Sequence, residues 1–329
     1  MIPGVTSQPL NPIRIKGKIK VFPEDFVVAE VIRKGINAKE GRHLLAVVEK
    51  KGVEHKVIAN EFGKEAHYLG IKDKEALAYF FVSFKRVKVN LKEIPNVKVR
   101  IVGKTKRLLS RKDLLGNAFK IKVRECECLE EAFNSWKKLL EGWKVPNFYG
   151  HQRFALNNHL IGEAIVKRDF KTADELLYRE GYEGLKGTPL WLKRFYVQSY
   201  QSYLFNRELS KVLNGEVKGE PKLVELSEQI FNGKVEAAYL PGYGFRDKGD
   251  VYSKALIEVA KEEGIKFRHF YVDEIKEVSQ EGGIRPAKIP SYKVSYSLSP
   301  DVGEAVLRFV LYRGSYATVA LRELLKEEA

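Results

Sequence analysis

Cysteine is almost absent from this chain, whose 329 residues contain only Cys126 and Cys128. So few thiols exclude a disulfide-stabilised scaffold, and no Cys/His spacing of the zinc type occurs, so we expect no metal site. The two cysteines lie one residue apart in a run that we interpret as an alternating strand, which would turn both thiols to one face of a sheet as structural groups. This usage predicts a reduced, cytoplasmic protein.

Long apolar runs are also missing. No stretch reaches the roughly 18 uninterrupted apolar residues of a membrane span. Met1–Gly4 lacks the charged-then-apolar pattern of a secretory signal. No GxxxxGK[ST] or GxGxxG frame occurs, so we expect no nucleotide or other small-molecule cofactor. The chain is nevertheless 44% hydrophobic, which is enough for more than one compact unit.

Acidic residues are outnumbered, since 43 Asp and Glu face 58 Lys and Arg and leave a net charge of +15. Between Lys85 and Lys112 the chain has one acid, Glu93, and a dense series of basic residues: Lys85, Arg86, Lys88, Lys92, Lys98, Arg100, Lys104, Lys106, Arg107, Arg111 and Lys112. This run suits a polyanion, because each neutralised phosphate releases counterions. We expect Lys104, Lys106 and Arg107 to contact an RNA backbone. The alternative is a solvated face in a lysine-rich protein.

One carboxylate stands out. The stretch His67–Gly70 is followed by Lys72-Asp73-Lys74, so Asp73 is flanked by two lysines. Nearby opposite charges favour the ionised carboxylate, and an ionised, positioned carboxylate is a plausible covalent nucleophile. The alternatives are a helix N-cap or a surface charge.

A second informative stretch is the loop Val145–Phe154. It presents Asn147, Tyr149 and Arg153 between a proline and a phenylalanine. An Asn can bond a base edge or a carboxylate, and an aromatic ring can stack on a nucleobase. An aromatic-rich core loop would have the same composition.

Hydrophobic periodicity predicts an α/β chain. Before residue 150 we expect mainly strands, with helices over 53–62 and 129–143. The middle is mostly helical, with helices over 157–168, 173–180, 191–213 and 253–263. The segment 279–286 is interpreted as a glycine-rich loop with one arginine, Arg285. The end has strands over 292–298 and 305–311 and a final helix with Ser315 as its N-cap.

Eight segments, in order, carry a resemblance. They are Lys20–Phe26, Tyr68–Asp73, Leu115–Phe119, Pro146–Phe154, Gln201–Asn206, Pro241–Phe245, Glu281–Pro286 and Gly314–Leu324. Together they resemble the TruD family of tRNA pseudouridine synthases, especially its archaeal members. The resemblance implies an α+β pseudouridine synthase catalytic domain with a mixed, largely antiparallel sheet, formed by residues 1–155 and 291–329. Residues 156–290 would be the family's mostly helical α/β insertion domain.

The resemblance also implies an activity and residue roles. The enzyme would isomerise uridine, usually uridine 13 of tRNA, and would act as a monomer. Asp73 matches the catalytic aspartate, and Lys20 matches the basic residue that pairs with it. The expected substrate-binding residues are Phe26, Asn147, Tyr149, Arg153 and Tyr316. Relatives often have Asn-Tyr-Phe-Gly where this chain has Asn147–Gly150, so the ring expected to stack on the base here carries a hydroxyl.

The chemistry fits these residue types, because the isomerisation needs no redox partner or group donor. Whether Asp73 adds to the base or attacks ribose C1′ stays open. One rival is a non-catalytic RNA-binding protein that has kept the fold, which a turnover assay distinguishes. Another is an RNA-modifying enzyme of different chemistry, but a deaminase needs a Cys-rich zinc site and a methyltransferase needs a glycine-rich first βα turn.

Overall fold

The computed structural model describes residues 1–37, 40–63, 66–70, 72–85, 94–155 and 157–326. The chain forms two compact units. We call the first the helical unit; it comprises Met1–Pro9, Pro146–Glu225 and Lys234–Lys288. We call the second the sheet unit; it comprises Leu10–Val145, Leu226–Gly233 and Ile289–Ala329.

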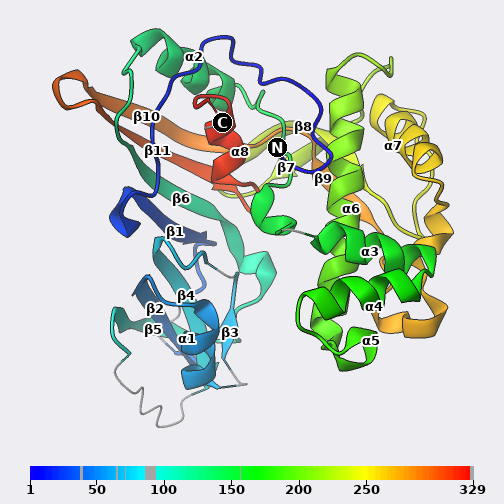
Figure 1. The fold of residues 1–329 in the computed structure, drawn as a ribbon. Helices are drawn as coiled ribbons and strands as arrows, with labels where there is room; N and C mark the ends of the chain where they lie inside the picture. The colour runs from blue at the N-terminus through cyan, green and yellow to red at the C-terminus, as the bar shows by residue number, and fades with distance from the viewer. Residues whose placement is uncertain (38–39, 64–65, 71, 86–93, 156, 327–329) are drawn as a thin grey trace. The chain divides into compact units, whose positions relative to one another are not determined.

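The sheet unit is built on an eight-stranded sheet, counted over the described residues. Its order is β10-β11-β6-β1-β4-β2-β5, and the short β3 pairs with β4 (Figure 1). The β1–β4 pair is parallel and the other pairs are antiparallel. The predicted mixed, largely antiparallel sheet is therefore confirmed. The strand bounds are β1 Phe26–Ile32, β2 His43–Lys51, β3 His67–Tyr68, β4 Leu77–Lys85, β5 Val97–Thr105, β6 Leu114–Val123, β10 Ser291–Ser299 and β11 Glu304–Tyr312.

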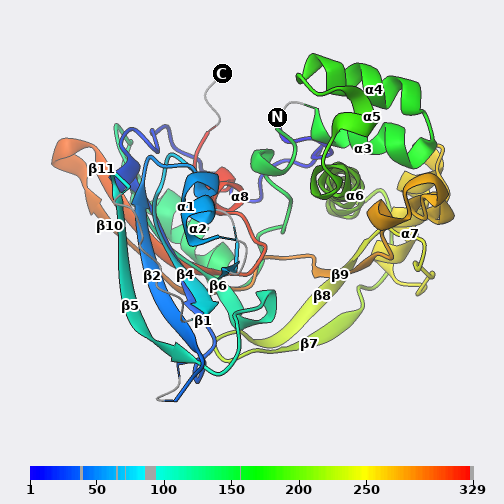
Figure 2. The same ribbon diagram turned by 90° about the horizontal axis from the view of Figure 1, so that it is seen from below.

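Helices cover one face of this sheet. They are α1 (His55–Phe62), α2 (Glu130–Glu141) and α8 (Ala317–Arg322), which Figure 2 shows on the same side. The strand register shows which side chains lie on this face. Phe119 of β6 is paired with Val28 of β1 and with Phe309 of β11, and side chains of paired residues point to the same face of a sheet. Trp136 of α2 packs edge-on against Phe309 at 5.6 Å. The opposite face carries a second cluster of Leu45, Leu69, Leu109 and Leu114.

The helical unit is organised around the long α6 (Leu190–Leu213), against which α3 (Asn158–Lys167) and α7 (Val251–Glu262) pack. At the α3–α6 crossing a Cβ on Gly162 would lie 2.0 Å from the carbonyl oxygen of Tyr196, so only glycine permits this approach. The remaining helices are α4 (Phe170–Arg179) and α5 (Gly184–Gly187). No helix within the described part of the chain is long and apolar enough to cross a membrane.

A second sheet, three-stranded within the described residues, lies mostly in the helical unit. It has the order β7-β8-β9, with bounds Leu223–Ser227, Asn232–Leu240 and Gly283–Pro286. Leu226–Gly233, which joins β7 to β8, belongs to the sheet unit. The expected glycine-rich loop over 279–286 is therefore wrong at its end, because Gly283–Pro286 pairs with β8. The two glycines hid the strand, whose pairing comes from a segment distant in sequence.

Two other local predictions are wrong. The run with Cys126 and Cys128 is not a strand, because β6 ends at Val123 and Glu125 and Cys128 have positive φ. The thiols instead contact each other, with Sγ atoms 2.6 Å apart. Burial raises the pKa of Cys126 to about 12, which keeps it a thiol at neutral pH. The N-cap of α8 is Tyr316 rather than Ser315.

A buried acid inside the helical unit gives a stability prediction. Glu208 of α6 is fully buried; one oxygen accepts the Tyr239 N–H at 3.0 Å and the other has no hydrogen bond among the described residues. Burial raises the pKa of Glu208 well above its usual value, and Asp250 adds to that rise. Because the folded-state pKa exceeds the unfolded one, stability is greatest below the unfolded pKa and is lost as pH rises toward the folded pKa.

We therefore expect Glu208→Gln to remove this pH-dependent loss. Relative to the wild type, the variant should gain about 1.4 kcal/mol of unfolding free energy for each pH unit between about pH 5 and the raised folded-state pKa of Glu208. Urea unfolding midpoints at several pH values measure it. Glu175→Gln, at an exposed carboxylate of α4, is the control. Parallel pH profiles for wild type and Glu208→Gln would contradict the prediction.

Candidate active site and RNA-binding surface

The sheet unit brings Lys20, Phe26 and Asp73 together. Lys20 Nζ lies 3.2 Å from Asp73 Oδ2 and 4.8 Å from the centre of the Phe26 ring. Lys20 has a φ of 58°, a left-handed conformation that a lysine adopts at a cost. The side chain of Asp73 is 39% exposed and that of Lys20 is 19% exposed. A half-exposed carboxylate held by a lysine on a strained backbone is the arrangement expected at a reactive site.

An ion pair fixes the segment that follows Lys20. Asp25 is buried and accepts two bonds from Arg124, each 2.9 Å long. It also accepts the Phe22 N–H at 2.9 Å, which closes the turn Pro23–Asp25 before β1. Phe26 begins β1 and is 4% exposed, with its ring edge-on to Phe119. The buried Phe26 ring therefore packs against the Lys20 ammonium group.

Further charges surround Asp73. Lys50 of β2 is buried and donates to the carbonyl oxygens of Asp73 and Val53. Burial lowers the pKa of Lys50, and the charge of Asp73 acts in the opposite direction. Lys72 turns inward, and its Nζ lies 2.6 Å from Glu30 Oε1 in a buried ion pair. Burial raises the pKa of Glu30, and Lys72 opposes that rise.

These contacts decide one alternative for Asp73. It lies between β3 and β4 and precedes a strand, so it is not a helix N-cap. Its backbone is held by Lys50, while its side chain faces Lys20. Lys74 is exposed and lies 3.7 Å from Glu54. The lysines on either side of Asp73 in sequence, Lys72 and Lys74, therefore lie against Glu30 and Glu54, and the ion pair described above joins the Asp73 carboxylate to Lys20.

The loop Pro146–Gly150 belongs to the helical unit and is bound to β9. Asn147 is 1% exposed; its backbone N–H donates to Ala287 and its side-chain amide donates to the carbonyl of Pro286 at 2.9 Å. Its Oδ1 accepts from the guanidinium of Arg285 at 2.9 Å. These contacts of Asn147 fix Arg285 and the loop.

Arg285 in turn covers Tyr149. Its Cζ lies 4.1 Å from the centre of the Tyr149 ring, and the residue is buried. Phe205 of α6 packs edge-on against the same ring at 5.5 Å. Arg153 lies 5.7 Å from the ring centre and donates through Nε to Ser202 at 3.0 Å. One face of Tyr149 is thus already stacked, and at most the other can receive a base.

Tyr316 belongs to the sheet unit, as Asp73 does. It is half-buried at the N-cap of α8, where its carbonyl accepts the N–H groups of Val319 and Ala320.

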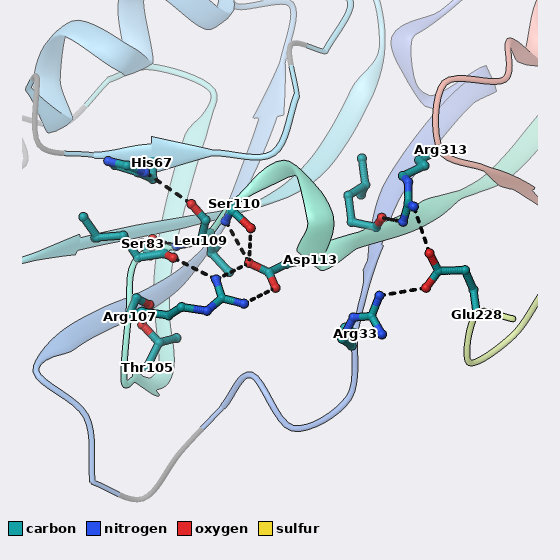
Figure 3. Close-up of polar contacts among 12 residues, drawn as sticks. Arg33, His67, Ser83, Thr105, Arg107, Leu109, Ser110, Asp113, Glu228 and Arg313 are labelled. Carbon is teal, nitrogen blue, oxygen red and sulfur yellow. Dashed lines mark hydrogen bonds and ion pairs between the residues drawn. The ribbon is translucent and has the colours of Figure 1, made fainter. Parts of the chain in front are cut away.

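The basic run is only partly described, since Arg86, Lys88, Lys92 and Glu93 lie outside the described residues. Lys104 lies near the end of β5, an edge strand of the sheet, and Lys106 is exposed just beyond it. Arg107 is different, because both guanidinium NH groups bind the buried Asp113 at 2.7 and 2.6 Å (Figure 3). Side-chain hydrogen bonds from Arg107 lower the pKa of Asp113, against the effect of burial. Arg107 therefore stabilises the turn Arg111–Asp113, whatever else it contacts.

Comparison with known proteins matches this chain to one family. The model of the tRNA pseudouridine synthase D (TruD) family matches residues 11–188 and 220–324. The chain belongs to this family. It is a pseudouridine synthase, an isomerase of uridine in tRNA. It is 28% identical to a probable tRNA pseudouridine synthase D of Pyrococcus furiosus over 95% of this chain and 96% of that protein. It is 30% identical to a protein of the same name from Pyrobaculum arsenaticum over 94% and 92%.

A crystal structure shares the fold. It is that of a putative tRNA pseudouridine synthase D (TruD) from Methanosarcina mazei, with a TM-score of 0.71 and 22% identity over 100% of this chain and 96% of that chain. The predicted fold class, a mixed α+β fold with a large mixed sheet and helices, is thereby confirmed.

Several residues around these TruD segments escaped sequence reasoning. Lys50 and Glu30 occupy ordinary strand positions, and no pattern marks them as neighbours of Asp73. Arg285 had a signal, because it is the one cation in the segment Glu281–Pro286. Its stacking on Tyr149 depends on β8–β9 pairing, which the sequence concealed.

Proposed function

We propose that this TruD protein converts uridine 13 of tRNA to pseudouridine with Asp73 as the nucleophile, acting as a monomer in the cytoplasm. The observation that supports the assignment is the contact of the half-exposed Asp73 carboxylate with Lys20, a residue in a left-handed conformation. Strained backbone persists where the surrounding structure holds it, and often at functional sites. The family match supports the same reaction.

The reaction conserves all atoms of the nucleotide. The N1–C1′ bond breaks, the uracil turns, and C5 forms the new bond to C1′. C5 loses its proton and N1 gains one, so no oxidant, reductant or group donor takes part. Asp73 would act by attack on C1′ or by addition to the base, and each route requires an anionic oxygen at the uridine. Lys20 would offset that charge until the substrate binds.

Other residues would hold the substrate. Tyr149 would stack on the target base, and Arg153 would pair with the RNA near it. Phe26 and Tyr316 would form apolar walls of the uridine site. We assign Asn147 an indirect role, because its side chain binds Arg285 and Pro286. Residues 1–155 and 291–329 would form the catalytic domain, and 156–290 the TruD insertion.

The decisive experiment incubates the protein with unmodified tRNA transcripts. Carbodiimide treatment followed by reverse transcription then maps pseudouridine as stops at single-nucleotide resolution. A new stop at position 13 supports the proposal, and a stop elsewhere keeps the chemistry but changes the site. Binding without any stop would favour the rival, a non-catalytic RNA-binding protein that has kept the fold.

Binding of tRNA should depend strongly on salt. We expect Lys104→Glu with Lys106→Glu to weaken tRNA binding and to make the slope of log K against log salt less steep by about two. Each lost phosphate contact changes this slope by nearly one, and the variant would lose two contacts. Filter binding between about 50 and 200 mM salt measures it.

Arg107 needs a separate treatment in that experiment, because its loss would also leave Asp113 buried without its partner. Arg107→Lys keeps the positive charge but cannot form the paired hydrogen bonds that the guanidinium makes to both oxygens of Asp113, so it tests that interaction alone. Lys254→Glu with Lys261→Glu, two exposed lysines of α7, is the matched control for charge reversal. A slope that is equal in the wild type and the Lys104/Lys106 variant would mean that the basic run is a solvated face.

A further inference from the structure

A buried lysine next to Asp73 has no part in the reaction described above. Lys50 is 0% exposed, and its Nζ donates to the carbonyl oxygen of Val53 at 3.0 Å and to that of Asp73. All three residues belong to the sheet unit. Taking an ammonium group out of water is unfavourable, so a lysine kept in such a place needs an explanation.

Packing of the core does not explain this lysine. Alternate residues of a strand point to the same face, so Ala46, Val48 and Lys50 form one row on β2. Ala46 and Val48 are fully buried in the core cluster that includes Ile58 and Phe62 of α1. An apolar residue would continue this row at position 50, and apolar residues of similar volume can often replace buried ionic groups without loss of stability.

A second buried lysine holds the residue before Asp73. Lys72 Nζ lies 2.6 Å from Glu30 Oε1, and the other oxygen of Glu30 accepts the backbone N–H of Phe81 at 2.8 Å. Glu30 belongs to β1 and Phe81 to β4, so this pair connects Lys72 to two strands of the sheet. Lys50 adds a connection from β2 to Asp73 itself.

These hydrogen bonds act on the backbone around Asp73. A bond to the carbonyl oxygen of Asp73 fixes the planar peptide group that follows it, and a fixed backbone limits the directions that the side chain can take. The carboxylate meets Lys20 at 3.2 Å and is 39% exposed. Such precise placement matters for a reacting group, because a displacement of about 1 Å can cost about a hundredfold in rate.

We propose that Lys50 is a positioning residue, which holds the backbone of Asp73 so that its carboxylate points toward the uridine in the reactive orientation. The inference deepens the proposed function and rests on it, since it takes Asp73 as the nucleophile. Lys50 itself touches neither the RNA nor the reacting atoms. Its loss therefore slows the chemical step and leaves RNA binding unchanged.

The first test is Lys50→Met, which removes the ammonium group and continues the apolar row of β2. On the tRNA transcript, kcat should fall about a hundredfold or more, while KM and the Kd from filter binding should stay within about threefold of the wild type. Lys51→Met, at the exposed residue that follows on β2, makes the same change of charge and should keep the wild-type kcat. Melting temperatures show whether each variant is folded.

The second test, Lys50→Ala, separates the ammonium group from packing, because the smaller side chain leaves space for a small amine. At constant ionic strength, n-propylammonium should raise kcat of this variant about tenfold or more. The neutral 1-propanol, which has nearly the same shape, should not. A side chain that only filled space would be replaced equally well by either molecule.

The outcomes separate this inference from the proposed function. If the wild type is active and Asp73→Asn is not, but Lys50→Met keeps the wild-type kcat, the positioning role is overturned and the proposed function stands. Loss of tRNA affinity together with kcat, or equal rescue by amine and alcohol, would make Lys50 a structural residue and also overturn it. If Lys50→Met does not fold, the rescue of Lys50→Ala decides, and failure of both variants to fold overturns the role. If Asp73→Asn is as active as the wild type, the proposed function fails and the positioning role fails with it.

Discussion

Asp73→Asn should reduce pseudouridine formation to below about one thousandth of the wild-type rate, a loss of the size expected when a nucleophile is removed. Asparagine keeps the shape of the side chain and its contact distance to Lys20, but it has no anionic oxygen. The affinity for tRNA should stay within about threefold of the wild type, since the variant removes one negative charge from a basic protein. Single-turnover assays with excess enzyme measure the chemical step, and filter binding measures the affinity.

Glu75→Gln is the matched control for this variant. Glu75 is an exposed carboxylate two residues from Asp73, and we expect its amide to keep nearly full activity. Mass spectrometry must show that the introduced asparagine has not deamidated, because a trace of restored aspartate would mimic residual activity. Activity of the intact Asp73→Asn variant above a few per cent would end the assignment of Asp73 as nucleophile.

The stretch around Asp73 shows what a sequence reveals and what it conceals. Two lysines flank Asp73, which indicated a carboxylate in a positive environment. The structure keeps that environment but changes the partners, since Lys72 binds Glu30 and the lysine facing the carboxylate is Lys20. The Lys20 partner came from the family resemblance alone, because 53 residues separate the two. No periodicity reports such a contact.

Fold prediction succeeded where a local pattern decided the element. The amphipathic period over 53–62 and the alternation over 292–298 and 305–311 correspond to α1, β10 and β11. It failed where a long-range partner decided it, as in β9, which two glycines disguise and which forms only against β8. The cysteine run failed for a third reason, because the positive φ of Glu125 and Cys128 ends the extended chain without a glycine to signal it.

The aromatic residues of α6 recur at steps of three and four residues, a spacing typical of a helix that packs into a core, and most of them do so. Tyr196, Tyr200 and Phe205 are buried. Phe195 instead lies under Arg153, with the guanidinium 4.8 Å from the ring centre. Helical periodicity predicts which side of a helix turns inward, but it does not tell a core partner from a cation on a neighbouring loop.

Tyr149 gives the second large effect. Tyr149→Phe should keep most activity, because phenylalanine retains the aromatic ring that packs against Arg285 and that would stack on the base. It also restores the residue common among relatives. Tyr149→Leu keeps apolar bulk but loses the aromatic plane. Base stacking contributes about 1–3 kcal/mol, so kcat/KM should fall by about five to two hundred times if the ring holds the flipped base in the transition state. Steady-state kinetics on the tRNA transcript measure both variants.

The contact with Arg285 requires a control, because Tyr149→Leu would also leave that buried guanidinium without its ring. Melting temperatures separate the two effects, since a packing defect lowers stability and loss of base stacking does not. Tyr178→Leu, at an exposed ring of α4, should change neither activity nor stability. Equal damage from Tyr149→Phe and Tyr149→Leu would point to the hydroxyl as the working group. Full activity in Tyr149→Leu would show that Tyr149 packs beneath Arg285 and takes no part in holding the base.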